Sequence, residues 1–379
     1  MLPTSRFALL APFATPVTGG VTAPRRSRAA AVGSGVKRRD KLDLALLFSS
    51  HSTVSAATFT RNAAAVPVRL PCETSDCGRL RGVVINAGNA NACTGRHGLA
   101  DAARMRLLAA HGLRLPVEQV AVCSTGLIRA PLPMDSIEAG IVAAARAVPS
   151  GGGVAAVDRF AVAILTTDRH ARAGALEVVV PVGEVKLGFA AKGCGMISHD
   201  MATMLWFVTR DAVMGVERWA RLPHDAVERS FNRITGDGQE STNDTVVGLC
   251  NGASGVEPGE EGVKRLGETL DAALAALALC IAADGEGSTR VMKPAVTGAG
   301  DVARAGVRVR PGLPGRAPGR GPHQWRHGTQ GGRRAQGAPG RRGDHLHHRR
   351  ECRTRRTARD HDRRSLRDQG RRMSPSVVV

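Results

Sequence analysis

Apolar residues recur along the chain in two patterns, which predict alternating strands and helices as far as about residue 283. Short apolar runs bounded by glycine, proline and polar residues predict strands, at residues 43–48, 55–60, 83–86, 117–123, 159–165 and 203–208, and a hairpin at 175–193. Apolar residues spaced three and four apart predict helices, at residues 98–113, 136–147, 216–235 and 257–283. Alternating strands and helices are typical of an α/β fold built in layers.

Small polar residues follow several of these strands at the points where the strands end. A Ser-Thr-Gly turn with Thr125 and Gly126 is expected after one strand, and Thr166 is expected at the end of the next. The Thr125 hydroxyl and the unobstructed amide of Gly126 make a suitable donor pair for a developing oxyanion. The stretch NAGNANACTG (86–95) fits either a buried turn whose backbone approaches another segment or a ligand, or a plain strand-to-helix connection.

Length and charge narrow the classes of function. The chain has 379 residues, 42% of them hydrophobic, which is enough for one large or two moderate domains with a core. Residues 301–379 carry 21 of the 53 basic side chains but only 6 of the 33 acidic ones, so +15 of the net charge of +20 lies there. The rest of the chain is nearly balanced, as in an ordinary soluble protein, and is not expected to bind nucleic acid or anionic membranes.

The cysteine pattern and the hydropathy of the chain indicate where in the cell the protein is expected to work. The eight cysteines form no CxxC pair and no Cys/His spacing of a zinc site, so they predict reduced, mostly buried thiols and no metal centre. No stretch approaches the roughly 18 unbroken apolar residues of a membrane span, and a cytoplasmic location is expected. Residues 1–15 are interpreted as a leader with one arginine and an apolar patch broken by prolines.

The stretch AAKGCGMISHDMATML (190–205) is the centre of the functional hypothesis. Thr203 follows Gly193 and Gly195, and we interpret Ala202–Thr203 as a peptide bond that the protein cuts in itself. A threonine hydroxyl is a weak nucleophile that needs a base within hydrogen-bond reach. After a cut before Thr203, its own α-amine, with an ordinary pKa of about 7.7 to 8.0, supplies that base. The alternative at this point is an ordinary threonine that opens a strand.

Motifs spread over the first 300 residues resemble those of one known family. They are GVTAP (20–24), NAGNANACTG, VCSTG, PLPMD, ILTTD, AKGCGMI, MATML, SFNRIT, STNDT and DGEGSTRVMK, and they keep the family's order and spacing from about residue 16 to about residue 300. The family is the bifunctional glutamate N-acetyltransferase, also called ornithine acetyltransferase, of arginine biosynthesis. So many matches in order make coincidence implausible.

The resemblance implies an Ntn-hydrolase-like fold of α/β layers that cleaves itself before Thr203. Residues 16–202 would form an alpha chain and residues 203–304 a beta chain, and two of each would associate in a heterotetramer. The enzyme would move an acetyl group from N2-acetylornithine to glutamate through an acyl-threonine. Acetyl-CoA as an alternative acetyl donor stays open at this point, and no cofactor is expected.

The resemblance also assigns roles to individual residues. Thr203 is the expected nucleophile, and Thr125 and Gly126 are the expected oxyanion hole. Lys192 carries a compact charge that suits an amino-acid carboxylate. The expected substrate contacts are Thr166, Lys192, Thr203 and Glu286.

The chain departs from the family near the proposed cut and in its last 75 residues. His199 and Asp200 stand where the family usually has Pro-Asn, and residues 169–172 replace the usual Thr, Pro and Lys. Residues 305–379 are rich in arginine, glycine and proline without a hydrophobic period, which predicts a disordered basic tail. We interpret this tail as a frameshift product of a GC-rich gene, because the family's ordered C-terminal region, with its substrate contacts, is replaced there.

Other functions stay open at this point. Because of this tail, one alternative is that the chain is an inactive or truncated member of the family. A second is a protein that binds nucleic acid through the arginine-rich tail, although folded binding motifs and interleaved aromatic residues are lacking. An N-terminal-threonine or serine aminopeptidase is disfavoured by the asparagine-rich and STNDT motifs, and HLHH (345–348) is a weak signal for a metal site.

Overall fold

The structure is a computed structural model that describes residues 11–38, 41–60, 65–198, 204–287 and 291. These residues belong to one compact unit, and a second unit, Leu313–Ser374, lies outside the described residues. Several predictions lie outside them as well, namely the cleavage site Ala202–Thr203, most of the leader, the histidine cluster 345–348 and the tail 305–379. These predictions, and the division into alpha and beta chains, stay predictions.

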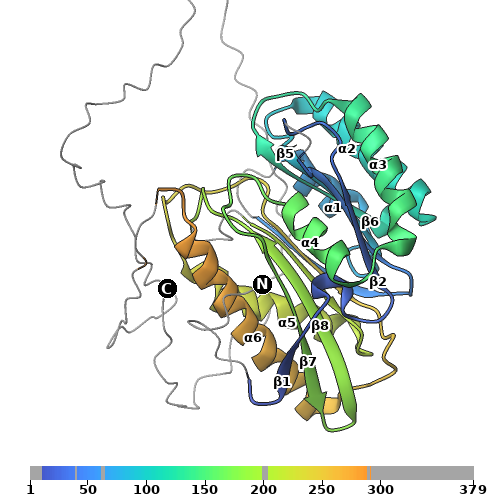
Figure 1. Ribbon diagram of the computed structural model, residues 1–379, viewed down its shortest axis with the longest axis vertical. Helices are drawn as coiled ribbons and strands as arrows, with labels where there is room; N and C mark the ends of the chain where they lie inside the picture. The colour runs from blue at the N-terminus through green and yellow to red at the C-terminus, as the bar shows by residue number, and fades with distance from the viewer. Residues whose placement is uncertain (1–10, 39–40, 61–64, 199–203, 288–290, 292–379) are drawn as a thin grey trace, which may run out of the picture. The chain divides into compact units, whose positions relative to one another are not determined.

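The described chain forms two β-sheets (Figure 1). The six-stranded sheet has the order β1-β7-β8-β9-β10-β4, and the four-stranded sheet has the order β2-β3-β5-β6. The strands of the larger sheet are β1 (Ala14–Val17), β4 (Val54–Phe59), β7 (Arg172–Val180), β8 (Gly183–Lys192), β9 (Leu205–Arg210) and β10 (Thr245–Cys250). Those of the smaller sheet are β2 (Ser27–Val32), β3 (Leu44–Ser49), β5 (Gly82–Asn89) and β6 (Val120–Leu127).

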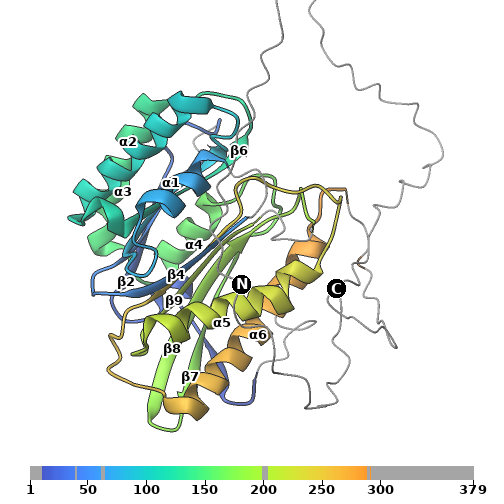
Figure 2. The ribbon, with the colours of Figure 1, turned by 180° about the vertical axis from the view of Figure 1, so that it is seen from behind.

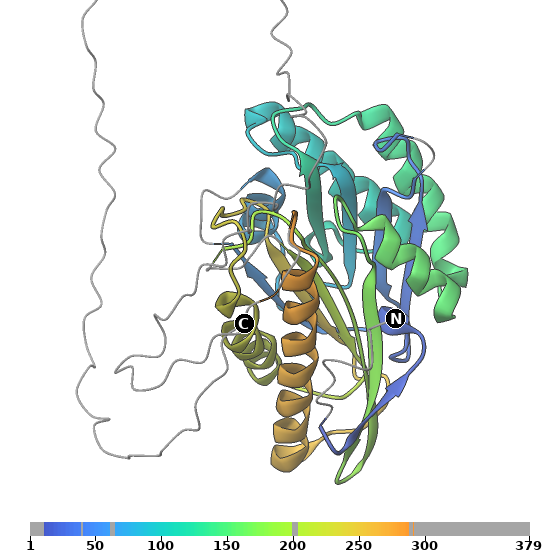
Figure 3. The same ribbon diagram turned by 60° about the vertical axis from the view of Figure 1, so that its left-hand side comes forward.

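The two sheets face each other across an apolar core, and helices cover their outer faces (Figures 1 and 2). The four-stranded sheet is covered by α1 (Val66–Thr74), α2 (Gly95–Leu113) and α3 (Met134–Ala147). The six-stranded sheet is covered by α5 (Val216–Arg229) and α6 (Gly259–Ala283), which lie side by side in Figure 3. The helix α4 (Gly153–Ala163) packs into the core between the sheets. The predicted layered α/β architecture is confirmed.

Strand β9 contributes to the apolar clusters on both faces of its sheet. Trp206 and Val208 lie in the cluster covered by α5 and α6, whereas Leu205 and Phe207 lie in the cluster between the sheets. Successive residues of a strand point to opposite faces, so a strand that is buried on both faces needs an unbroken apolar run. The run LWFV meets this need, and the chain next to the proposed nucleophile is therefore anchored in the core.

The predicted strand at residues 159–165 is wrong, because most of these residues lie in helix α4. Val157, Phe160 and Ala163 are spaced three residues apart and pack together in the core between the sheets. A short apolar run does not distinguish a buried strand from a buried helix segment. Tertiary packing decides between them here.

The predicted turn at residues 124–126 is also wrong. Strand β6 continues to Leu127 and pairs in parallel with β5. The pairing is irregular at Gly88 and Asn89, where the two strands come to their ends. Because parallel neighbours end at the same edge of a sheet, the asparagine-rich stretch and the Ser-Thr-Gly stretch lie side by side.

The predicted hairpin and the predicted long helix are confirmed as β7–β8 and α6. Among the described residues, α6 is long and apolar enough by composition to cross a membrane. Its leucines Leu266, Leu270, Leu274 and Leu277 are buried in the core against the six-stranded sheet. The apolar composition of α6 therefore matches its packing in the core.

Candidate active site

Predicted site residues line one pocket with a volume of about 1140 Å³. The pocket gathers the end of β6, the loop after α4, the end of β8 and the segment after α6. The end of β8 pairs with the start of β9, so the pocket also lies next to the chain that leads to the proposed nucleophile. The predicted residues that line it are Thr125, Gly126, Thr166, Lys192 and Glu286.

Gly126 has a backbone conformation that other residues rarely adopt, with φ of 130°. A side-chain carbon at this position would lie 2.3 Å from the carbonyl carbon of Gly88. Only glycine permits so close an approach of β5 and β6 at this conformation. The local geometry thus leaves the Gly126 amide without a side chain beside it, as its predicted role requires.

The Thr125 hydroxyl is oriented by Lys192. The Lys192 ammonium donates a hydrogen bond to Thr125 Oγ1 over 2.6 Å, and both side chains are buried. An ammonium is only a donor, so the hydroxyl oxygen accepts and its single proton is left for another partner. The adjacent positive charge also makes that hydroxyl a stronger donor.

Lys192 itself is buried beside two carboxylates. Burial lowers the pKa of the Lys192 ammonium, whereas the negative charges of Asp168 and Asp244 act in the opposite direction. The sequence indicated Lys192 only as a contact for a substrate carboxylate. The structure adds a contact with Thr125, which lies 67 residues away along the chain.

Glu286 lines the pocket and stays accessible to solvent. Its amide donates to the carbonyl oxygen of Cys194 over 2.9 Å, and its Oε1 accepts from the Thr167 hydroxyl over 2.6 Å. Gly195 permits this approach, because a side-chain carbon there would lie 2.9 Å from Glu286 Cδ. The carboxylate is thus held on the pocket wall, where it suits a cationic amine.

Met204, the neighbour of the proposed nucleophile, is held by Asp244. The Met204 amide donates to Asp244 Oδ1 over 2.9 Å, and Asp244 is buried. The parallel pairing of β9 and β10 brings the two residues together, because both lie directly before their strands. Burial raises the pKa of Asp244 to about 7.

Replacing Asp244 with asparagine is expected to remove a pH dependence of stability. The raised pKa means that the native chain holds a proton here at pH values between 3.8 and about 7, where the unfolded chain has lost it. The free energy of unfolding therefore falls as the pH rises through this window, by up to about 1.4 kcal/mol per unit. Asparagine keeps an oxygen for the Met204 amide and does not ionise.

Urea unfolding of both chains at pH 5 and pH 8 measures this effect. The asparagine variant should gain stability relative to the unchanged chain as the pH rises. A stability difference that is the same at both pH values would contradict the assigned pKa of Asp244.

The asparagine-rich stretch is tied to the backbone around it. Asn91 Nδ2 donates to the carbonyl oxygen of Gly98 over 2.9 Å. Asn243, from the STNDT motif, donates through Nδ2 to the carbonyl oxygens of Ala90 and Ser124, over 2.7 and 2.9 Å. Of the two interpretations left open for the stretch, these contacts favour a buried turn whose backbone approaches another segment, and Gly88 and Ala90 of this turn also line the pocket.

Lys37 and Asp168 also line the pocket, and the sequence had indicated no role for either of them. Lys37 Nζ donates to the carbonyl oxygens of Leu42 and Ala163, over 2.9 and 3.1 Å, and burial lowers its pKa to about 8. The Asp168 side chain is buried and accepts from two backbone amides and from an arginine. Lys37 stands in a loop without periodicity, so no sequence signal distinguished it from a solvated lysine, whereas the ILTTD motif, which ends at Asp168, could have marked that residue.

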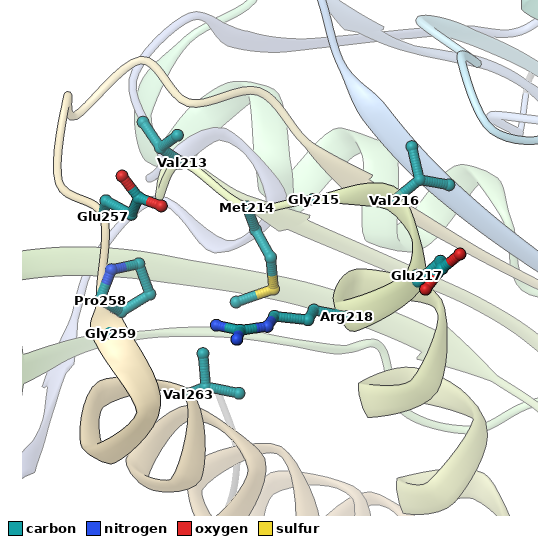
Figure 4. A pocket seen from close by; sticks show the side chains of 10 residues that line it. All are labelled: Val213, Met214, Gly215, Val216, Glu217, Arg218, Glu257, Pro258, Gly259 and Val263. Carbon is teal, nitrogen blue, oxygen red and sulfur yellow. The ribbon is translucent and has the colours of Figure 1, made fainter.

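A second hollow of about 460 Å³ lies where α5 and α6 begin (Figure 4). The side chains of Met214, Arg218 and Val263 point into it. None of the predicted site residues that the structure describes lines this hollow. The larger pocket is therefore the candidate active site.

The fold and the pocket together define a class of protein. A layered α/β core presents a hydroxyl oriented by a buried ammonium, a glycine amide and a carboxylate at the ends of its strands, an arrangement suited to acyl transfer. The family model of ArgJ matches residues 28–310, and the chain belongs to the ArgJ family. ArgJ proteins are acyltransferases of arginine biosynthesis, so the resemblance found in the motifs is confirmed.

Two relatives with similar sequences support this assignment, and one solved structure is reported beside them. The arginine biosynthesis bifunctional protein ArgJ of Symbiobacterium thermophilum is 42% identical over 295 residues, covering 76% of this chain and 72% of the relative. That of Parasynechococcus marenigrum is 41% identical over 288 residues, covering 75% and 69%. The solved structure of an ornithine acetyltransferase from Mycobacterium tuberculosis, complexed with ornithine, is 36% identical, with a TM-score of 0.44 over 50% of this chain and 99% of that chain.

Proposed function

We propose that the chain transfers an acetyl group from N2-acetylornithine to glutamate through an acyl-threonine on Thr203. The observation that carries the proposal is the hydrogen bond from Lys192 to Thr125 beside Gly126. It leaves the Thr125 proton available to an oxyanion, which forms only when a carbonyl carbon is attacked. Membership in the ArgJ family supports acetyl transfer in arginine biosynthesis as the reaction.

The first step is cleavage of the Ala202–Thr203 bond. The Thr203 hydroxyl oxygen attacks the carbonyl carbon of Ala202, the C–N bond breaks, and the nitrogen takes up the hydroxyl proton. Water then hydrolyses the resulting ester, which leaves a carboxylate on Ala202 and a free amine and hydroxyl on Thr203. The bond from the Met204 amide to Asp244 supports this step, because it anchors the chain on the carboxyl side of the nucleophile.

Acetyl transfer follows in two halves. The α-amine of Thr203 takes its own hydroxyl proton, and the oxygen attacks the acetyl carbonyl of N2-acetylornithine. Thr125 and Gly126 donate hydrogen bonds to the oxyanion, the C–N bond breaks, and ornithine leaves with the proton. The glutamate amine then attacks the acetyl ester, N-acetylglutamate is released, and Thr203 regains its proton.

One pocket can serve both substrates, because acetylornithine and glutamate each carry an α-carboxylate on a short aliphatic frame. Lys192, Thr166 and Glu286 supply an ammonium, a hydroxyl and a carboxylate to the wall of the pocket. We assign them to the substrate carboxylate and amine groups. The proposal extends to acetyl-CoA as an alternative donor, to a heterotetramer of two alpha and two beta chains, and to work in the cytoplasm.

A denaturing gel and a transfer assay test the proposal together. The purified chain should run as two fragments, and the second should begin at Thr203 by N-terminal sequencing. It should then form acetylglutamate from N2-acetylornithine and glutamate, with acetyl-CoA tried as donor in a parallel reaction. Two fragments without transfer would favour the inactive family member, and peptide hydrolysis without transfer would favour the aminopeptidase.

The alternatives that depend on residues 305–379 have tests of their own. A salt-dependent mobility shift with RNA or DNA would support binding of nucleic acid through this segment. The frameshift hypothesis predicts a family-like continuation in another reading frame of the gene past codon 300. If no such continuation is found, the hypothesis is wrong.

A further inference from the structure

A buried ion network lies beside the pocket, and Arg172 is at its centre. Arg172 is the first residue of β7 and is 3% exposed. Its Nη1 donates to Asp168 Oδ1 over 2.8 Å, and its Nη2 donates to Asp284 Oδ2. A guanidinium presents its donors in a rigid fork, so it fixes the separation of the two carboxylates that it binds.

Asp168 connects Arg172 to one side of the pocket. Its Oδ1 also accepts from the Gly193 amide over 2.7 Å, and its Oδ2 accepts from the Thr166 amide over 3.1 Å. Gly193 directly follows Lys192 in the chain. This carboxylate therefore holds the backbone at two of the predicted substrate contacts.

Asp284 connects Arg172 to the segment after α6, which carries Glu286. It lies directly after α6, and its Oδ2 also accepts from the Arg169 amide over 3.0 Å. Glu286 is two residues further on, with its amide bound to the Cys194 carbonyl oxygen. The position of Glu286 is thus tied to the same guanidinium.

We propose that Arg172 is a positioning residue for acetyl transfer. By joining the two carboxylates, it fixes the position of Glu286 relative to Thr166 and Lys192. Arg172 does not line the pocket and acts through its neighbours. This role rests on the proposed function, because it concerns the same pocket.

The variants Arg172→Met and Arg172→Lys test the role. Methionine removes the charge between the carboxylates, and we expect kcat/KM for both amino-acid substrates to fall by about 100-fold, as for a positioned group displaced by about 1 Å. Lysine keeps a positive charge there and should restore most of the loss. A gel with the two fragments of the unchanged chain shows that each variant has folded well enough to be cut.

The pH profile provides a readout that a merely structural role would not move. Burial would raise the pKa of Asp168, but the charges of Lys192 and Arg172 hold it below its ordinary value. Lys37 and Cys194 also face this carboxylate. Removing the guanidinium should raise the pKa of Asp168, so the acidic limb of kcat/KM should move to higher pH in the methionine variant and stay in place in the lysine variant.

Asp284→Asn is the second variant, for the case in which Arg172→Met does not fold. It breaks one arm of the network, and we expect kcat/KM to fall in this variant as well. Unchanged kcat/KM and an unchanged pH profile in the folded variants would overturn the positioning role. If the unchanged chain transfers no acetyl group, the proposed function fails, and the positioning role is then tested separately by calorimetry with ornithine. Equal affinity for ornithine in Arg172→Met and in the unchanged chain would overturn the positioning role. An affinity about tenfold weaker in Arg172→Met would support it.

Discussion

Replacement of Thr203 with alanine is expected to abolish both self-cleavage and acetyl transfer. Without the hydroxyl, no oxygen attacks the carbonyl carbon of Ala202, and no acetyl ester forms. Loss of the nucleophile in covalent catalysis lowers kcat by several orders of magnitude, on the order of 10⁴-fold or more. The variant should run as one uncut chain on a denaturing gel and form acetylglutamate no faster than a reaction without protein.

Thr203→Ser is the matched control, because serine keeps a hydroxyl and, after the cut, an α-amine. It should be cut at the same bond and should transfer acetyl groups at a reduced rate. Mass spectrometry of the acetylated protein should find the acetyl group on the peptide that begins at residue 203. An uncut chain that transfers acetyl groups at the normal rate would refute the mechanism.

Replacement of Thr125 with valine is expected to lower kcat by about 10²- to 10³-fold, the usual loss for one donor of an oxyanion hole. Valine has nearly the shape of threonine but no hydroxyl, so the oxyanion would keep only the Gly126 amide. The KM for glutamate should change little, because the hydroxyl acts mainly on the charge that develops during the reaction. Steady-state kinetics on the cut enzyme measures both quantities.

The same variant leaves the buried Lys192 ammonium without its hydroxyl acceptor. An unsatisfied buried donor costs about 1 to 3 kcal/mol of stability, so urea unfolding should detect the loss. Thr125→Ser keeps both the acceptor and the donor and should restore stability and most of kcat. An unchanged kcat in the valine variant would show that Thr125 does not stabilise the oxyanion.

The predicted site residues could be named from the sequence because motifs carry them, whereas their mutual contacts could not be predicted. Lys192 and Thr125 are 67 residues apart, and Arg172 and Asp284 are 112 residues apart. No local pattern links such pairs. The first contact depends on how the six-stranded sheet, which carries Lys192, packs on the four-stranded sheet, which carries Thr125. The second depends on the position where α6 ends.

Helices and strands were predicted correctly where the helical or the strand spacing of apolar residues continued long enough to exclude the other kind of element. The helix α6 and the hairpin β7–β8 meet this condition, and both were predicted. Residues 159–165 do not, since their short apolar run fits a buried strand as well as a helix. The packing of Phe160 on Phe207, with ring centroids 5.6 Å apart, belongs to the helical form.

The sequence by itself determined the layered α/β class, the family and five of the residues that line the pocket, because periodicity and motifs are properties of the chain alone. Only the tertiary structure decided that Lys192 directs the Thr125 hydroxyl, that Asp244 holds the Met204 amide and that Arg172 joins two carboxylates. The physical reason is that hydrogen bonds and ion pairs depend on distances of a few ångströms between side chains. Strand pairing and helix packing fix those distances, and spacing along the chain does not.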